Sequence, residues 1–147
     1  MKFRQLRKNE VISASKIVGQ NYFSRYERAS LEDFRAMFGK QWIRPQYRVI
    51  EAKKKPIAVA GFIASVMDYH TYELFWVNVA PEYQRRGIGT KLVAQVLSEI
   101  KKIRGKDKQA YLVLLGTTKP AFYGQFKFRT LLRFNKRKHY LMALSLE

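Results

Sequence analysis

The residues best suited to chemistry are 84–90, with the sequence QRRGIGT. Gly87 and Gly89 let the backbone approach an anion closely. A predicted helix follows, and the first N–H groups of a helix have no partners inside it, so they can donate to phosphate oxygens. Arg85 and Arg86 add mobile positive charge. The stretch therefore predicts a loop that binds a pyrophosphate.

The segments on either side place this loop between a strand and a helix. Residues 74–79, LFWVNV, are typical of a strand, which Pro81 ends. After the loop, apolar side chains at helical spacing predict a helix of about four turns packed on a sheet; they are Leu92, Val93, Val96, Leu97, Ile100 and Ile103. Neither the P-loop pattern nor the dinucleotide-binding pattern of glycines is present.

The loop resembles the Arg/Gln-x-x-Gly-x-Gly/Ala signature of the GNAT superfamily of acyl-CoA N-acyltransferases, with Gln84, Gly87 and Gly89 at its three defining positions. Residues 115–128, LGTTKPAFYGQFKF, resemble a second family run, Gly-Asp-Pro-x-Tyr-Tyr-Gly-x-Phe-Gly-Phe, which places a tyrosine at Tyr123. The sequence departs from that run before the proline and at its closing glycine. The resemblance implies a GNAT fold, acetyl-CoA as cosubstrate and an amine as acceptor.

The N-terminal half has no family motif, and its elements are predicted from pattern alone. Residues 2–6 alternate weakly and predict a strand. Asn9 is expected to cap a first helix, and Ser30 to cap a second one that stops at Gly39. Three antiparallel strands follow as a meander, over residues 47–52, 57–66 and 72–79.

The C-terminal half predicts the rest of the sheet. An almost wholly apolar strand over 110–115 should be central and parallel to the strand before the loop, because a helix joins the two. A short helix over 119–126 and strands over 129–134 and 139–146 complete the chain. We therefore expect one α/β (α+β) domain over residues 1–147. It should have a mixed, mostly antiparallel sheet of six to seven strands with helices on both faces.

Composition limits the chemistry. The 147 residues include no cysteine and only two histidines, so we expect no disulfide, no metal site and no cysteine nucleophile. The first residues do not resemble a signal peptide, and no apolar run is long enough to span a membrane. These features predict a soluble, cytoplasmic protein. An exposed edge strand near the C-terminus is compatible with a homodimer.

The formal net charge of +18 indicates an anionic partner. Residues 101–138 contain twelve basic side chains against the single acid Asp107. This excess predicts either a solvated surface, steering of the coenzyme, or contact with nucleic acid, a ribosome or an acidic substrate. The alternative function is thus a basic nucleic-acid- or ribosome-associated module on the same scaffold. Like-charge repulsion disfavours polycationic acceptors unless the acceptor groove is locally acidic.

The resemblance also implies how the coenzyme would be held. The strand before the loop splays from its parallel neighbour, and the pantetheine arm pairs with the backbone of Val77, Asn78 and Val79. The N–H of Val79 or Asn78 would stabilise the thioester oxyanion. The pyrophosphate would meet the loop through its N–H groups, the Thr90 hydroxyl and the Arg85 side chain. The N–H groups belong to Arg86, Gly87, Ile88, Gly89 and Thr90.

Two side chains are predicted to move protons. Glu73 lies eleven positions before Gln84, where some family members place a catalytic glutamate, and simple alternation would put it on one face with Phe75, Val77 and Val79. The alternative to a catalytic role for Glu73 is a surface ion pair with a Lys or Arg.

Tyr123 matches the family tyrosine that protonates the coenzyme A thiolate. We expect the basic surroundings to lower its pKa. The alternative role for Tyr123 is aromatic packing. His70 is a further candidate base, although a lone histidine at a strand turn is more often a surface residue.

Overall fold

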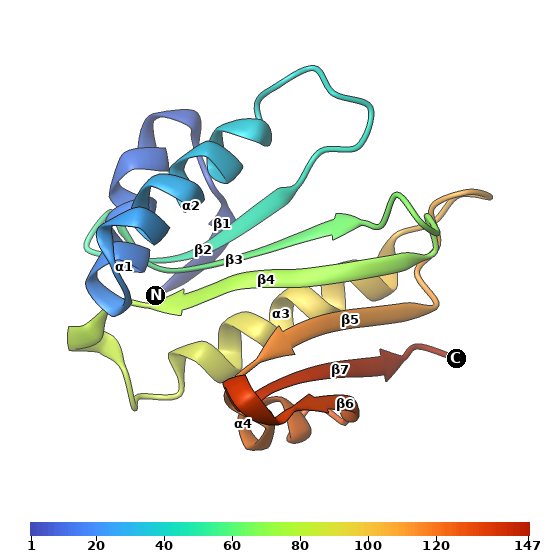
Figure 1. The fold of residues 1–147 in the computed structure, drawn as a ribbon. Coiled ribbons are helices and arrows are strands. Elements are labelled where there is room, and N and C mark those ends of the chain that lie inside the picture. The colour runs from blue at the N-terminus through green and yellow to red at the C-terminus, as the bar shows by residue number, and fades with distance from the viewer.

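The computed structural model describes residues 1–147, built around one seven-stranded sheet in the order β1-β2-β3-β4-β5-β7-β6 (Figure 1). Every neighbouring pair is antiparallel except β4 and β5, which are parallel. The strands are β1 (Lys2–Gln5), β2 (Gln46–Ala52), β3 (Lys55–Ala64), β4 (Thr71–Val79), β5 (Leu112–Thr117), β6 (Arg129–Phe134) and β7 (His139–Ser145). The predicted mixed sheet and its single parallel pair are confirmed.

Helices cover both faces of the sheet, as predicted (Figure 1). On one face, α1 (Val11–Asn21) and α2 (Ser24–Ala36) enclose a core of nine buried residues. On the other face, α3 (Ile88–Lys102) packs over a larger core of nineteen buried residues, and α4 (Pro120–Gly124) adds partly buried aromatics to it. Five of the six apolar residues predicted for the loop helix, those from Leu92 to Ile100, belong to the buried stripe of α3. The sixth, Ile103, follows the helix as its C-cap residue and is partly buried.

The two predicted caps in the N-terminal half are wrong. Ser30 is fully buried in the middle of α2, where its hydroxyl donates to the carbonyl of Glu27 at 2.9 Å. A serine can satisfy its hydroxyl on the preceding turn, so it does not have to mark a helix end. Asn9 lies in a 3₁₀ turn, η1 (Lys8–Glu10), and Glu10 is the residue that precedes α1.

The C-terminal edge of the sheet is exposed, as predicted. All six side chains of β6 are exposed, and only β7 pairs with this strand. A homodimer through this edge stays a prediction. No helix in the structure has the length and apolar character needed to cross a membrane.

Candidate active site

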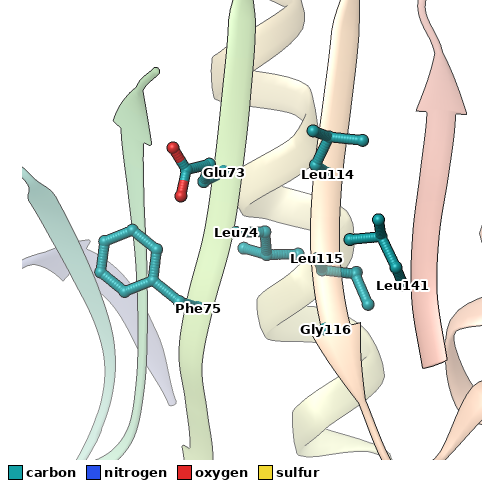
Figure 2. A pocket seen from close by; sticks show the side chains of 7 residues that line it. All are labelled: Glu73, Leu74, Phe75, Leu114, Leu115, Gly116 and Leu141. Carbon is teal, nitrogen blue, oxygen red and sulfur yellow. The ribbon is translucent and has the colours of Figure 1, made fainter. Parts of the chain in front are cut away.

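β4 and β5 pair only at their beginnings and then diverge. Their register joins Thr71 to Leu112, Tyr72 to Val113 and Glu73 to Leu114, and no later residues of the two strands are paired. A cavity of about 260 Å³ lies at the divergence (Figure 2). It is lined by Glu73, Leu74, Phe75, Leu114, Leu115, Gly116 and Leu141. We call it the splay cavity.

β4 contains a bulge just beyond the splay. The β3–β4 register shifts between Val59 and Gly61, which leaves Trp76 and Val77 opposite Ala60. Trp76 has φ 51°, a left-handed conformation that is an outlier for a bulky residue. A bulge places two residues against one, so it bends the strand and re-aims its side chains.

The bulge reverses the side-chain alternation along β4. Glu73 and Phe75 point the same way, opposite to Leu74 (Figure 2), and Phe75 packs on the α1/α2 core. Val77 and Val79 pack on the α3 core instead. The predicted shared face of these four residues is therefore wrong, because simple alternation cannot foresee the extra residue at position 76.

Glu73 lines two cavities. It is exposed, lines the splay cavity, and also lines a second cavity of about 370 Å³ between β4, α2 and the segment before β2. The structure has four ion pairs, and none involves Glu73. The alternative of a surface ion pair is not what the structure shows. A free carboxylate here can accept a proton from a molecule held in either space.

The predicted anion loop forms the open N-terminus of α3. Gly87 is the N-cap residue at φ 77°, and the first helical hydrogen bond runs from the N–H of Lys91 to its carbonyl at 3.0 Å. The N–H groups of residues 88–90 therefore precede the hydrogen-bond ladder. No atom lies within 4 Å of a Cβ built on Gly87, so the space beside the loop is empty of protein. Arg85 and Arg86 are exposed and have no acidic partner.

Gln84 fastens the loop to its neighbours. Its Nε2 donates to Asn21 Oδ1 at 2.8 Å and to the Val79 carbonyl at 2.9 Å. Asn21, at the end of α1, donates in turn to Asn78 Oδ1 and to the same carbonyl. This network joins α1, the end of β4 and the loop. The amide of Gln84 is therefore used to hold the loop in position. Nothing in the sequence pointed to Asn21, which lies 63 residues from Gln84.

Tyr123 lies on α4 in an aromatic cluster beside the loop. Its ring is 4.9 Å from that of Phe122 and 6.0 Å from that of Phe128. A Cβ on Gly89 would lie 3.5 Å from Phe122 Cζ and 3.6 Å from Val79 Cγ2. The end of β4, the start of α3 and α4 therefore converge.

The predicted fall in the Tyr123 pKa is wrong. Burial raises the pKa of its phenol, and the neighbouring Tyr22 raises it further. Removal from water disfavours the phenolate, and no basic side chain lies close enough to reverse that effect. Tyr123 therefore stays protonated and able to donate.

His70 lies at the other end of β4. It precedes Thr71, where the strand begins, whereas the loop follows Val79, where it ends. Its Nδ1 is 2.6 Å from the Gln109 carbonyl, and its ring stacks on Tyr111 at 4.9 Å. The structure does not bring His70 to the loop. It also contains no group of three or more His, Cys, Asp or Glu side chains that could hold a metal ion.

Comparison with known proteins identifies the family of this chain. The acetyltransferase (GNAT) domain model matches residues 44–130, so the chain belongs to the GNAT acetyltransferase family. No curated protein matches the sequence significantly.

Solved structures share the fold at low identity. A GNAT-family protein from Desulfovibrio desulfuricans is 15% identical with a TM-score of 0.85, covering 99% of each chain. The ribosomal-protein-S18-alanine N-acetyltransferase from Escherichia coli is 19% identical with a TM-score of 0.75, covering 99% of this chain and 94% of that one. A GNAT-family acetyltransferase from Brucella melitensis, in complex with acetyl-CoA, is 16% identical with a TM-score of 0.71, covering 99% of this chain and 88% of that one.

Proposed function

We propose that this chain is an acetyl-CoA-dependent N-acetyltransferase that transfers an acetyl group to a primary amine of a small molecule or a protein. The observation that supports this most is the position of Glu73, a carboxylate without an ion pair that lines both the splay cavity and the second cavity. Membership of the GNAT family supports the reaction class. The acetyl-CoA bound to the Brucella protein supports the donor.

The residues present fit acetyl-CoA as a substrate. The stretch of β4 that no longer pairs with β5, with Val77, Asn78 and Val79, offers backbone groups to the pantetheine arm. The N–H groups at the start of α3 and the Thr90 hydroxyl offer donors to the pyrophosphate, and Arg85 and Arg86 add positive charge. The empty space beside Gly87 leaves room for the phosphates.

Each step of the transfer has a candidate group in this chain. Acetyl-CoA supplies a thioester, so that a C–N bond forms to the amine, the C–S bond breaks and coenzyme A leaves as a thiol. Glu73 accepts the proton that the ammonium must lose before its nitrogen can attack. The backbone N–H of Val79 or Asn78 stabilises the oxyanion, an effect of about 3 kcal/mol in other acyl transferases. Tyr123 donates its proton to the departing sulfur, and the second proton that the nitrogen loses as the amide forms restores the phenol.

The test is amine-dependent release of free thiol from acetyl-CoA, with the product identified by mass. The proposal predicts one acetylated amine for each thiol released, from a panel of primary amines and peptide N-termini. Binding of acetyl-CoA without acetylation of any amine in the panel would contradict it. If acetyl-CoA does not bind at all, the proposed reaction fails at its first step.

A second candidate function is contact with nucleic acid through the basic surface. All twelve basic side chains in residues 101–138 are exposed, and none forms an ion pair. Phosphate contacts by such side chains would give affinity that falls steeply with salt. Binding of a single-stranded RNA oligonucleotide over a salt titration tests this. Affinity equal to that of a lysine-rich control protein of the same charge would refute it.

A further inference from the structure

The second cavity has the opposite charge to the rest of the molecule. The chain has 29 basic and 11 acidic side chains. Yet the lining of this cavity includes two acids and no lysine or arginine. Its lining residues are Asp33, Ala36, Gln41, Ile43, Pro45, Tyr47, Ile63, Glu73 and Phe75. Asp33 and Glu73 are therefore the only ionisable acids or bases with ordinary charge at neutral pH among the residues that line this cavity.

Tyr47, which lines this cavity, has an unsatisfied hydroxyl. The residue is fully buried, and its Oη has no hydrogen-bond partner. Burial raises the pKa of the phenol, and the negative charge of Asp33 raises it further, although no hydrogen bond joins the two. Buried polar groups nearly always have a partner, so an orphaned one beside a cavity indicates a place for a ligand.

Asp33 is held in place by the bulge of β4. Trp76 Nε1 donates to Asp33 Oδ2 at 2.7 Å, and no basic side chain pairs with this carboxylate. Asp33 is exposed, and its other carboxylate oxygen, Oδ1, accepts no hydrogen bond from the protein. The left-handed Trp76 therefore aims its indole at α2 and fixes a carboxylate that no protein cation neutralises.

We propose that the acceptor is a dication: one amino group is acetylated beside Glu73, while a second ammonium or guanidinium group is held by Asp33 and the hydroxyl of Tyr47. An ammonium can donate to a carboxylate and to a phenol oxygen together, which would give the Tyr47 hydroxyl a partner. This assignment rests on the proposed acetyltransferase function and deepens it. The local acidity that would admit a polycationic acceptor is thus present despite the +18 charge.

The test compares acceptors that differ only at the end remote from the reacting amine. Straight-chain diamines of four and eight carbons are compared with the monoamine and the ω-amino acid of the same length, by kcat/KM from thiol release. At one or both lengths, kcat/KM should fall roughly tenfold or more from diamine to monoamine, as expected for a charge-assisted hydrogen bond. It should fall further for the amino acid, because its carboxylate faces Asp33.

Asp33→Asn should abolish the preference for the diamine over the monoamine and lower kcat/KM for the diamine roughly tenfold. The amide keeps an oxygen for Trp76, so the fold should survive, which circular dichroism can check. Glu32→Gln is the matched control, since Glu32 neighbours Asp33 on α2 but lies outside the cavity lining. The control should keep the wild-type preference.

The outcomes separate the two claims. If amines are acetylated with equal kcat/KM for all three acceptors at both lengths, or if Asp33→Asn keeps the diamine preference, the dication assignment is overturned while the acetyltransferase function stands. If acetyl-CoA binds in calorimetry and no amine is acetylated, the function itself fails, and the assignment fails with it.

Discussion

Tyr123 is the residue whose role follows most directly from its surroundings. Burial raises the pKa of its phenol, so it carries a proton throughout the neutral range. Tyr123→Phe removes that proton donor and should lower kcat about 100-fold, with the Kd of acetyl-CoA nearly unchanged. Tyr111→Phe, the same change at a tyrosine that precedes β5 and stacks on His70, serves as control in the same steady-state assay. Unchanged turnover in Tyr123→Phe would leave the ring with a packing role only.

Tyr47 gives a prediction about stability. Because its buried hydroxyl has no partner, Tyr47→Phe should raise the free energy of unfolding by about 1 kcal/mol. The ring contacts with Phe34 and Phe75 remain. Urea unfolding at neutral pH measures the change.

The matched control for Tyr47 is Tyr72, whose hydroxyl donates to the Lys108 carbonyl at 2.7 Å. Tyr72→Phe should lower the free energy of unfolding by about 1 kcal/mol. If both variants lose stability equally, the Tyr47 hydroxyl is bonded in the folded protein and the orphan interpretation is wrong.

The sequence predicted site residues only where a local motif marks them. Gly87 and Gly89 follow from spacing, and Tyr123 from a family run. Asn21 and Asp33 have no local signal, because their roles arise from contacts across 63 and 43 residues. Only the folded sheet brings such residues together.

At the scale of elements, the junction of β4, the loop and α3 determines the donor side. Gly87 has a left-handed φ and no atoms near a Cβ, so a side chain there meets backbone strain but no steric clash. Gly87→Ala should therefore cost about 1 kcal/mol of stability and weaken acetyl-CoA binding only modestly. Gly87→Glu should cost a similar amount of stability.

The difference between these two variants isolates the charge at the loop. Gly87→Glu places a carboxylate where the pyrophosphate is expected, so it should weaken acetyl-CoA binding in calorimetry roughly tenfold beyond the alanine variant. Equal affinities for the two variants would show that the phosphates do not lie at this helix N-terminus.

Elements with a strong period were predictable, and irregular ones were not. The buried stripe of α3 and the β2–β3 hairpin follow from apolar spacing and turn residues. The bulge at Trp76 has no marker within β4, which contains neither glycine nor proline. Yet that bulge decides which side chains of β4 face α2, and so which residues can meet an acceptor.

At the scale of the whole molecule, stability should depend on pH through its buried tyrosines. Burial raises the pKa of Tyr47 and of Tyr123, so the folded state keeps these phenols protonated above their ordinary value of 10.0. The unfolded state then binds fewer protons, and the free energy of unfolding falls as pH rises above that value. Below it, the contribution is fully present.

Urea unfolding at pH 9 and pH 11 measures this fall. Tyr47→Phe and Tyr123→Phe should each reduce the loss between the two pH values by about 1 kcal/mol relative to wild type. Comparison with wild type is needed because lysines also lose charge in this range and relieve the repulsion of the +18 molecule. An equal loss in wild type and both variants would mean that water reaches both phenols.

Glu73 is where the donor and acceptor sides meet, so its replacement tests the central claim most directly. Thiol release from acetyl-CoA with a saturating amine should fall about 100-fold in Glu73→Gln near neutral pH. It should recover partly at high pH, where the amine loses its proton without help, and the Kd of acetyl-CoA should be retained. Glu82→Gln, on the exposed turn before the loop, should behave as wild type. Wild-type turnover by Glu73→Gln at every pH would contradict the account.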